Sequence, residues 1–199
     1  MTTTPEPDPY TAHAAREDRL VQQYPTIFRD WRGDPQHTCM AWGLETPNGW
    51  WAVLEMVCAE ITAECARVNA YHPDAEFCVV AEQVKEKFGT LRFYYRVEFR
   101  PAWAETHPEA PDAIDRACEY IRGVVAHAER MTGRICNECG VGVDPGPRDP
   151  EGYRWHTVCP RCAQALRERN EARTAKFLER RAERAEADAN NENFRKGSL

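Results

Sequence analysis

The sequence predicts an α+β fold in which helices pack on a β-hairpin or small antiparallel sheet, followed by a cysteine-rich module and a charged C-terminal helix. Two segments, 49–70 and 113–130, repeat apolar residues at steps of three and four, which is the period of an amphipathic helix. Between them, residues 90–99 alternate apolar and polar side chains, which is the period of a β-strand. Two CxxC pairs after residue 135 are the third observation.

The N-terminal part carries weaker signals. Residues 1–9 have neither the basic nor the apolar region of a secretory signal, so we expect a disordered lead-in over 1–11. The Ala, Arg and Glu residues from 12 to about 24 predict a short helix that Pro25 ends. Residues 26–49 mix turn formers with large apolar side chains, and they predict either a packed loop or a pair of short strands.

The two amphipathic helices supply most of the predicted core. The apolar face of 49–70 includes Cys58 and Cys65, which we interpret as small core hydrophobes because free cysteine is often buried. A proline-rich loop separates the strands from the second helix, 113–130, which leads almost directly into Cys136. We therefore expect an α+β domain over 12–131.

A two-residue turn at Phe88-Gly89 predicts a hairpin over 77–99. This register places Glu82 on the apolar face opposite Tyr95, so either the tyrosine hydroxyl satisfies the carboxylate or the first strand bulges. The predicted pairs are Lys87–Thr90, Lys85–Arg92, Val84–Phe93, Gln83–Tyr94, Ala81–Arg96 and Val80–Val97.

Charge and cysteine content limit the function classes. The net charge is −6, with −8 in residues 1–130 and +2 in 131–199, so neither part has the basic balance typical of nucleic-acid binding. No apolar run approaches the length of about 18 residues that spans a bilayer. Nine cysteines without a secretory signal indicate a reducing compartment, and we expect a cytoplasmic protein, in the host cytoplasm if it is phage-encoded.

The cysteine pairs carry the most specific chemical signal. Cys136-x-x-Cys139 and Cys159-x-x-Cys162 are separated by 19 residues rich in Gly and Pro, a spacing typical of a zinc ribbon. Gly140 suits a left-handed turn after the first pair, and 153–158 predicts a short return strand. We place the ribbon at 132–165. His156 is an alternative ligand, but four cysteines already complete a shell.

Four thiolates predict a closed, structural Zn²⁺ site, because catalytic zinc keeps one position open. An iron–sulfur site and a CxxC redox pair are the competing interpretations, and the doubled motif disfavours the redox pair. His107-Pro-Glu109 followed by Cys136 and Cys139 mimics the pattern of zinc nucleobase deaminases. That alternative leaves Cys159 and Cys162 without a role.

The polar side of the hairpin is a second candidate site. A cationic strand face with an aromatic side chain can contact phosphates or stack a base, although solvated strands often carry Lys and Arg as well. This predicted binding face comprises Gln83, Lys85, Lys87, Arg92, Tyr94 and Arg96.

The last segment, 166–199, predicts a charged helix with a frayed tail. It lacks a sustained coiled-coil seam. Residues 161–188 hold eight basic and six acidic side chains, a balance that does not indicate a polyanion-binding tail.

The segment Val84-Lys-Glu-Lys-Phe-Gly-Thr-Leu-Arg-Phe-Tyr-Tyr95, with the following helix and cysteine ribbon, resembles a family of small uncharacterised phage and prophage proteins. The resemblance covers about residues 20–165. It implies a phage or prophage setting and lends no catalytic residues.

These features together predict a non-enzymatic, zinc-binding accessory protein that presents a surface to a macromolecule. The predicted partner is either a nucleic acid or a protein of the host or the phage. Binding to such a partner is expected to interfere with a process of the host. The sequence has no nucleotide-binding fingerprint or nucleophile elbow, and no small-molecule substrate is evident. The alternative is a deaminase-like hydrolase that uses His107, Glu109, Cys136 and Cys139.

Overall fold

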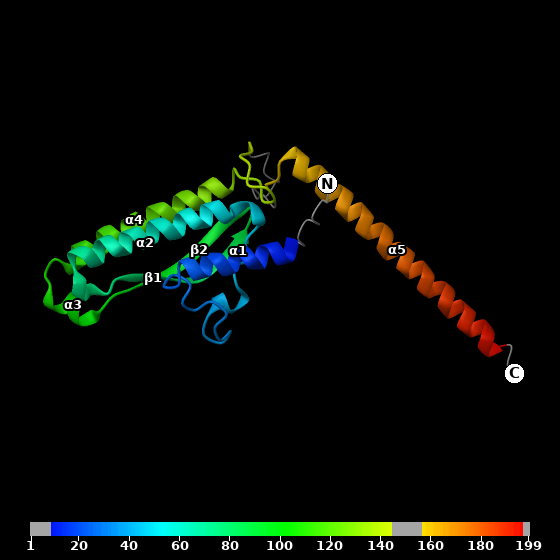
Figure 1. Cartoon of the computed structure of the whole chain (residues 1–199), viewed down its shortest axis with the longest axis horizontal. Helices are drawn as coiled ribbons and strands as arrows, with labels where there is room; N and C mark the ends of the chain where they lie inside the picture. Colours follow the sequence, from blue (N-terminus) through cyan, green and yellow to red (C-terminus); the bar gives the residue numbers. More distant parts are fainter. Residues whose placement is uncertain (1–8, 145–156, 197–199) are drawn as a thin grey trace, which may run out of the picture. The chain divides into compact units, whose positions relative to one another are not determined.

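The computed structural model describes residues 9–144 and 157–196 of the chain (Figure 1). Contacts divide the chain into two compact units, Met1–Val158 and Cys159–Leu199. Among the described residues, the first unit holds four α-helices and a two-stranded antiparallel sheet, and the second holds one long helix. The predicted α+β class is therefore confirmed.

The three helices predicted in the first unit are present with slightly different ends. Residues 9–11 belong to the first helix, so the predicted lead-in is too long at this end. The short helix α3 was not predicted, because its Pro101 was interpreted as a loop residue although proline also fits the first turn of a helix. In chain order the elements are α1 (Pro9–Gln23), the 3₁₀ helices η1 (Cys39–Trp42) and η2 (Asn48–Trp50), α2 (Trp51–Tyr71), the 3₁₀ helix η3 (Pro73–Ala75), β1 (Cys78–Lys87), β2 (Thr90–Glu98), α3 (Pro101–Thr106), α4 (Ala110–Thr132) and α5 (Pro160–Lys196).

The core of the first unit lies between the hairpin and the helices α2 and α4, which run side by side against it (Figure 1). Cys58 is fully buried in this core and Cys65 is partly buried against it, as predicted. Burial raises the pKa of both thiols, that of Cys65 to about 12. Both side chains therefore remain neutral thiols at physiological pH and pack as small apolar groups.

The hairpin turn lies where the sequence predicts it. Phe88 and Gly89 both have positive φ, 56° and 73°, as a two-residue hairpin turn of the primed type requires. The predicted register is confirmed next to the turn, where Lys85 lies opposite Arg92 and Gln83 opposite Tyr94.

Beyond Gln83 the predicted register is wrong by one residue. A β-bulge between Ala81 and Gln83 pairs Ala81 with Tyr95 and Val80 with Arg96. The bulge takes up Glu82 as an extra residue and exposes its side chain, so the carboxylate is not forced onto the apolar face.

Both outer edges of this hairpin are covered. On β1, the N–H of Ala81 donates to the Ile27 carbonyl at 2.8 Å, and Glu45 exchanges backbone hydrogen bonds with Val84 and Glu86. Residues 26–49 thus form a packed loop with short 3₁₀ turns, the first of the two alternatives predicted for them. On β2, side chains of α4 replace a third strand: the N–H of Leu91 donates to Thr132 Oγ1 at 2.9 Å.

Candidate metal centre

The structure brings the four predicted zinc ligands together. The Sγ atoms of Cys136, Cys139, Cys159 and Cys162 all lie within 4.8 Å of one another. Four sulfurs around one Zn²⁺ with bonds of about 2.3 Å would be about 3.8 Å apart at the corners of a tetrahedron. The cluster therefore has the size and the donor set of a four-thiolate metal site.

The first CxxC pair lies in a small hairpin directly after α4. The N–H of Cys136 donates to the Val141 carbonyl at 2.8 Å, and Ile135 forms an isolated antiparallel bridge with Gly142. Gly140 has φ of +78°, and its N–H donates to the Cys136 carbonyl at 3.0 Å. The predicted left-handed turn is confirmed, and it lets the chain reverse immediately after Cys139.

This hairpin is fastened to the start of α2 through Gly49. The N–H of Gly49 donates to the Asn137 carbonyl at 2.7 Å. The fit leaves no room for a side chain, since a Cβ on Gly49 would lie 1.9 Å from the Cys136 carbonyl oxygen. From the sequence, Gly49 is expected only to form a turn within residues 26–49, because nothing nearby in the sequence indicates contact with a segment almost 90 residues away.

The second CxxC pair lies at the start of α5. Cys159 directly precedes the helix, which begins at Pro160, and Cys162 lies in its first turn. The N–H of Cys162 points at Cys159 Sγ, 3.5 Å away. Backbone N–H donors and the positive end of a helix both stabilise a thiolate, so this position suits a metal ligand.

The helix α5 begins inside the region predicted as ribbon, 132–165. The predicted return strand at 153–158 and the alternative ligand His156 fall mainly or entirely outside the described residues. The structure thus shows the two cysteine pairs and their immediate turns.

The deaminase-like alternative conflicts with the geometry of α4. His107 and Glu109 precede this helix, whereas Cys136 follows it, and a helix of 23 residues is about 33 Å long. The His107 ring lies beside Trp103 instead, with Nδ1 3.1 Å from the Trp103 carbonyl oxygen. His107 and Glu109 therefore cannot share one metal ion with Cys136 and Cys139.

The predicted binding face on the hairpin is only partly free. Arg96 donates to Glu98 and to Asp30, each at 2.8 Å. Arg92 donates to Thr90 Oγ1 and to the Leu91 carbonyl. Lys85 lies over the Tyr94 ring, with 5.7 Å between Nζ and the ring centroid. The two arginines of this face are thus held by hydrogen bonds within the protein and Lys85 is half-buried, whereas Lys87 and the half-exposed Tyr94 are exposed to solvent.

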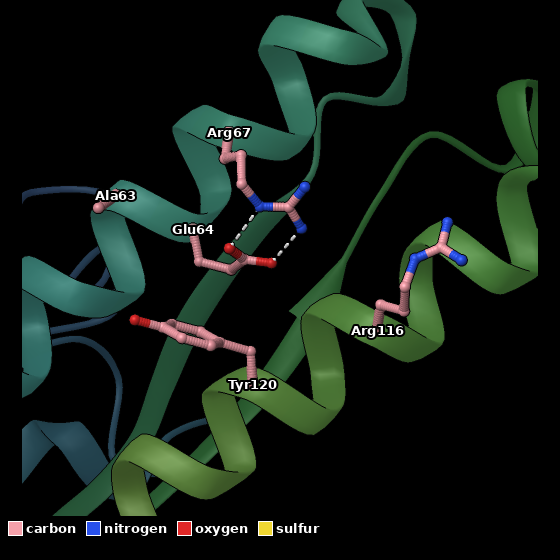
Figure 2. Close-up of a pocket in the computed structure, with 5 residues that line it drawn as sticks. All are labelled: Ala63, Glu64, Arg67, Arg116 and Tyr120. Carbon is pink, nitrogen blue, oxygen red and sulfur yellow. Dashed lines mark hydrogen bonds and ion pairs between the residues drawn. The ribbon is translucent and has the colours of Figure 1, made fainter.

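A shallow pocket of about 460 Å³ lies over the seam between α2 and α4 (Figure 2). Its wall contains Glu64, which is buried and accepts two hydrogen bonds from Arg67, at 2.6 and 2.7 Å. The Arg116 guanidinium extends away from this pair (Figure 2). Because the buried carboxylate and its arginine satisfy each other, we interpret this pair as a structural feature of the helix seam.

Comparisons with protein-family models, with curated proteins and with solved structures give no match to this chain. Within the residues that the structure describes, no helix combines the length and the apolar character needed to cross a bilayer. Within the described residues, the cysteine cluster is therefore the feature with the most specific chemistry.

Proposed function

We propose that this chain is a non-enzymatic accessory protein of phage type, which folds around one structural Zn²⁺ and presents its outer surfaces to a macromolecule. The observation that carries the zinc part is the cluster of four cysteine sulfurs within 4.8 Å of one another. The macromolecule-binding part rests on exposed aromatic and charged side chains outside the cluster.

Zinc fits the four cysteines better than the competing metals do. Zn²⁺ has no geometric preference from d electrons and is commonly held by four thiolates from two CxxC turns. A mononuclear iron site would use the same four ligands, and the visible absorption of iron would distinguish it from zinc. Copper(I) favours sites with fewer thiolates.

A structural role follows from the complete ligand shell. Four protein thiolates leave no position for a water or a substrate, so the metal would not act as a Lewis acid. Its effect would be on folding: the first pair holds the segment after α4 against Gly49 at the start of α2. Binding energy released at the cysteines would thus stabilise the contact between the ends of two core helices.

The metal is tested by elemental analysis of protein purified without added metal. We expect about one zinc per chain, no visible absorption from iron, and cobalt-substituted protein with the absorption bands of tetrahedral thiolate coordination. Cys139→Ser should lose most of the zinc and lower the melting temperature. The matched control is Cys39→Ser, which changes another exposed cysteine outside the cluster. Equal zinc content in the two variants would contradict the proposed ligand set.

The binding role is supported by exposed side chains that the fold does not use. Trp42 is 72% exposed and Tyr71 is 75% exposed, and aromatic residues of this kind are enriched in protein interfaces. Metal-binding thiolates require a reducing environment, which supports a cytoplasmic location. Affinity capture from host lysate with and without nuclease treatment would separate a protein partner from nucleic acid. The variants Trp42→Ala and Tyr71→Ala test the contribution of each exposed aromatic side chain separately.

A further inference from the structure

The long helix α5 carries a charge opposite to that of the rest of the chain. Residues 161–184 hold eight Lys and Arg against four Glu, a net charge of +4. Residues 1–158 hold 16 Lys and Arg against 25 Asp and Glu, a net charge of −9. Every side chain from Arg167 to Ala185 is exposed to solvent. The exposed helix therefore carries a net positive charge although the whole chain has a net charge of −6.

The cations of α5 are also sorted around the helix axis. Five of them recur at steps of three and four and fall within an arc of about 80° at 3.6 residues per turn. We call this set the basic stripe; it consists of Arg169, Arg173, Lys176, Arg180 and Arg184. With a rise of 1.5 Å per residue, it extends for about 22 Å along the helix.

The acidic residues lie mainly on other sides of the helix. Glu168, Glu171 and Glu179 fall about 60° or more outside the stripe, and only Glu183 borders it. No ion pair joins Arg173, Lys176, Arg180 or Arg184 to another residue in the part of the chain that the structure describes. The positive charge of these four residues is thus available to a partner.

We infer that the basic stripe of α5 binds the phosphodiester backbone of a nucleic acid. This inference rests on the proposed macromolecule-binding function and names the class of partner. Charge complementarity carries it: five cations along about 22 Å of one helix face match the regular array of phosphates on a nucleic acid, in which each strand of a duplex adds one negative charge per about 3.4 Å of the duplex axis. The contacts are to phosphates, so binding is independent of base sequence.

Two further features of the chain fit this partner. Phe177 borders the stripe and is 64% exposed, which places an aromatic side chain where it can contact sugars or base edges beside the phosphates. The acidic first unit repels the same polyanion, so its charge directs a nucleic acid to α5. Residues 161–188 have nearly balanced charge, which in the sequence does not indicate binding to a polyanion. The helix nevertheless places most of the acidic side chains outside the basic stripe, so this side of the helix is positively charged.

The test is the salt dependence of binding to a labelled DNA duplex, measured by fluorescence anisotropy with the full chain. If all five cations contact phosphates, log K should fall with log salt concentration with a slope of about −4 to −5. The variant Arg173→Gln/Arg180→Gln should make this slope shallower by about 2 and weaken binding at least about tenfold.

The matched control is Arg167→Gln/Arg181→Gln. It changes the net charge of the same helix by the same amount, but both residues lie about 60° or more outside the stripe. Glutamine, arginine and lysine have similar helix propensities, so both variants should keep the zinc content and helicity of the wild type. The control should keep the wild-type slope. Equal losses in the two variants would overturn the stripe as the binding element.

Three further outcomes of these measurements test the inference or the proposed function. If the wild type binds neither duplex nor single-stranded DNA or RNA at low salt while zinc content and folding are intact, the inference is overturned and the zinc-dependent fold stands. If the wild type instead forms dimers that the stripe variant abolishes, the acidic unit of a second copy occupies the stripe, and the inference is likewise wrong. Loss of zinc from the wild type would count against the proposed function alone.

Discussion

The backbone of Gly49, just before α2, lies directly against the backbone of Gly140, in the turn after the first cysteine pair. A Cβ on Gly49 would lie 2.7 Å from the Gly140 nitrogen, and a Cβ on Gly140 would lie 2.8 Å from the Gly49 carbonyl oxygen. Neither glycine can therefore be replaced without separating the two segments. This contact connects the predicted metal centre to the core of the first unit.

The first prediction is that Gly49→Ala destabilises the fold and weakens metal binding. The new methyl group would meet backbone atoms, which cannot rotate away as a side chain can, so we expect a loss of at least about 2 kcal/mol in the free energy of unfolding. Chemical denaturation and competition with a zinc chelator measure the two effects.

Gly142→Ala is the control for this substitution. Gly142 lies in the same small hairpin, but a Cβ there would have no neighbour within 4 Å. We expect stability and zinc affinity close to the wild type. If Gly49→Ala behaved like this control, the close contact between α2 and the cysteine turn would be wrong.

The second prediction concerns the outer edge of β2, where Thr132 accepts a hydrogen bond from the Leu91 N–H. Thr132 is fully buried, and its hydroxyl also donates to the Glu129 carbonyl at 2.9 Å. Thr132→Val keeps the shape but leaves the N–H of Leu91 without an acceptor, which should cost about 1–3 kcal/mol in unfolding free energy.

Thr132→Ser distinguishes the contribution of the hydroxyl group from that of the methyl group, because serine keeps the hydroxyl and lacks the methyl. It keeps the acceptor and should cost less than the valine variant, and the amide of Leu91 should stay protected in hydrogen exchange. A valine variant as stable as the wild type would mean that the edge of β2 does not depend on α4.

The elements that were predicted correctly are those that depend on the local spacing of residues in the sequence. The helices α2 and α4 and the turn at Phe88-Gly89 follow from side-chain spacing alone, and the grouping of the cysteines follows from two CxxC turns. In the hairpin, the conflict at Glu82 predicted either a hydrogen bond from Tyr95 or a bulge, and the structure adopts the bulge, which shifts the register beyond it.

Contacts between distant segments could not be predicted in this way. Gly49 and Thr132 look unremarkable in sequence, because a turn glycine and a helix-end threonine are common. Their roles depend on which backbone groups the fold brings next to them. The basic stripe was missed for a different reason, because a count of charges over a segment does not show how those charges are distributed around the helix axis.

The third prediction concerns pH and Glu98, which accepts hydrogen bonds from Arg29 and Arg96. These two arginines lower the pKa of Glu98 below its ordinary value of 4.5. A carboxylate whose pKa is lower in the folded state than in the unfolded state stabilises the fold at pH values above its unfolded-state pKa. This stabilisation is lost as the pH falls through the folded-state pKa.

Glu98→Gln should therefore be less stable than the wild type near pH 7, by less than about 1 kcal/mol because the site is partly exposed to solvent. The difference should shrink as the pH falls below about 4.5. Glu82→Gln removes the same charge from the bulge, where the carboxylate lies 4.0 Å from Arg96, and should have a smaller effect. A Glu98→Gln difference that grew on acidification would contradict the assignment.

The last prediction tests the pair of Glu64 and Arg67 at the α2–α4 seam (Figure 2). Arg67→Leu leaves the buried carboxylate without its two hydrogen bonds, and we expect a loss of about 1–3 kcal/mol in unfolding free energy. The double variant Glu64→Leu/Arg67→Leu removes both charges and should recover much of this loss, because a buried ion pair can be replaced by apolar side chains at little cost. Arg116→Leu, the control on the opposite wall, should change stability by less than about 0.5 kcal/mol. If the double variant were less stable than Arg67→Leu alone, Glu64 would be stabilising the seam by some contact other than its ion pair.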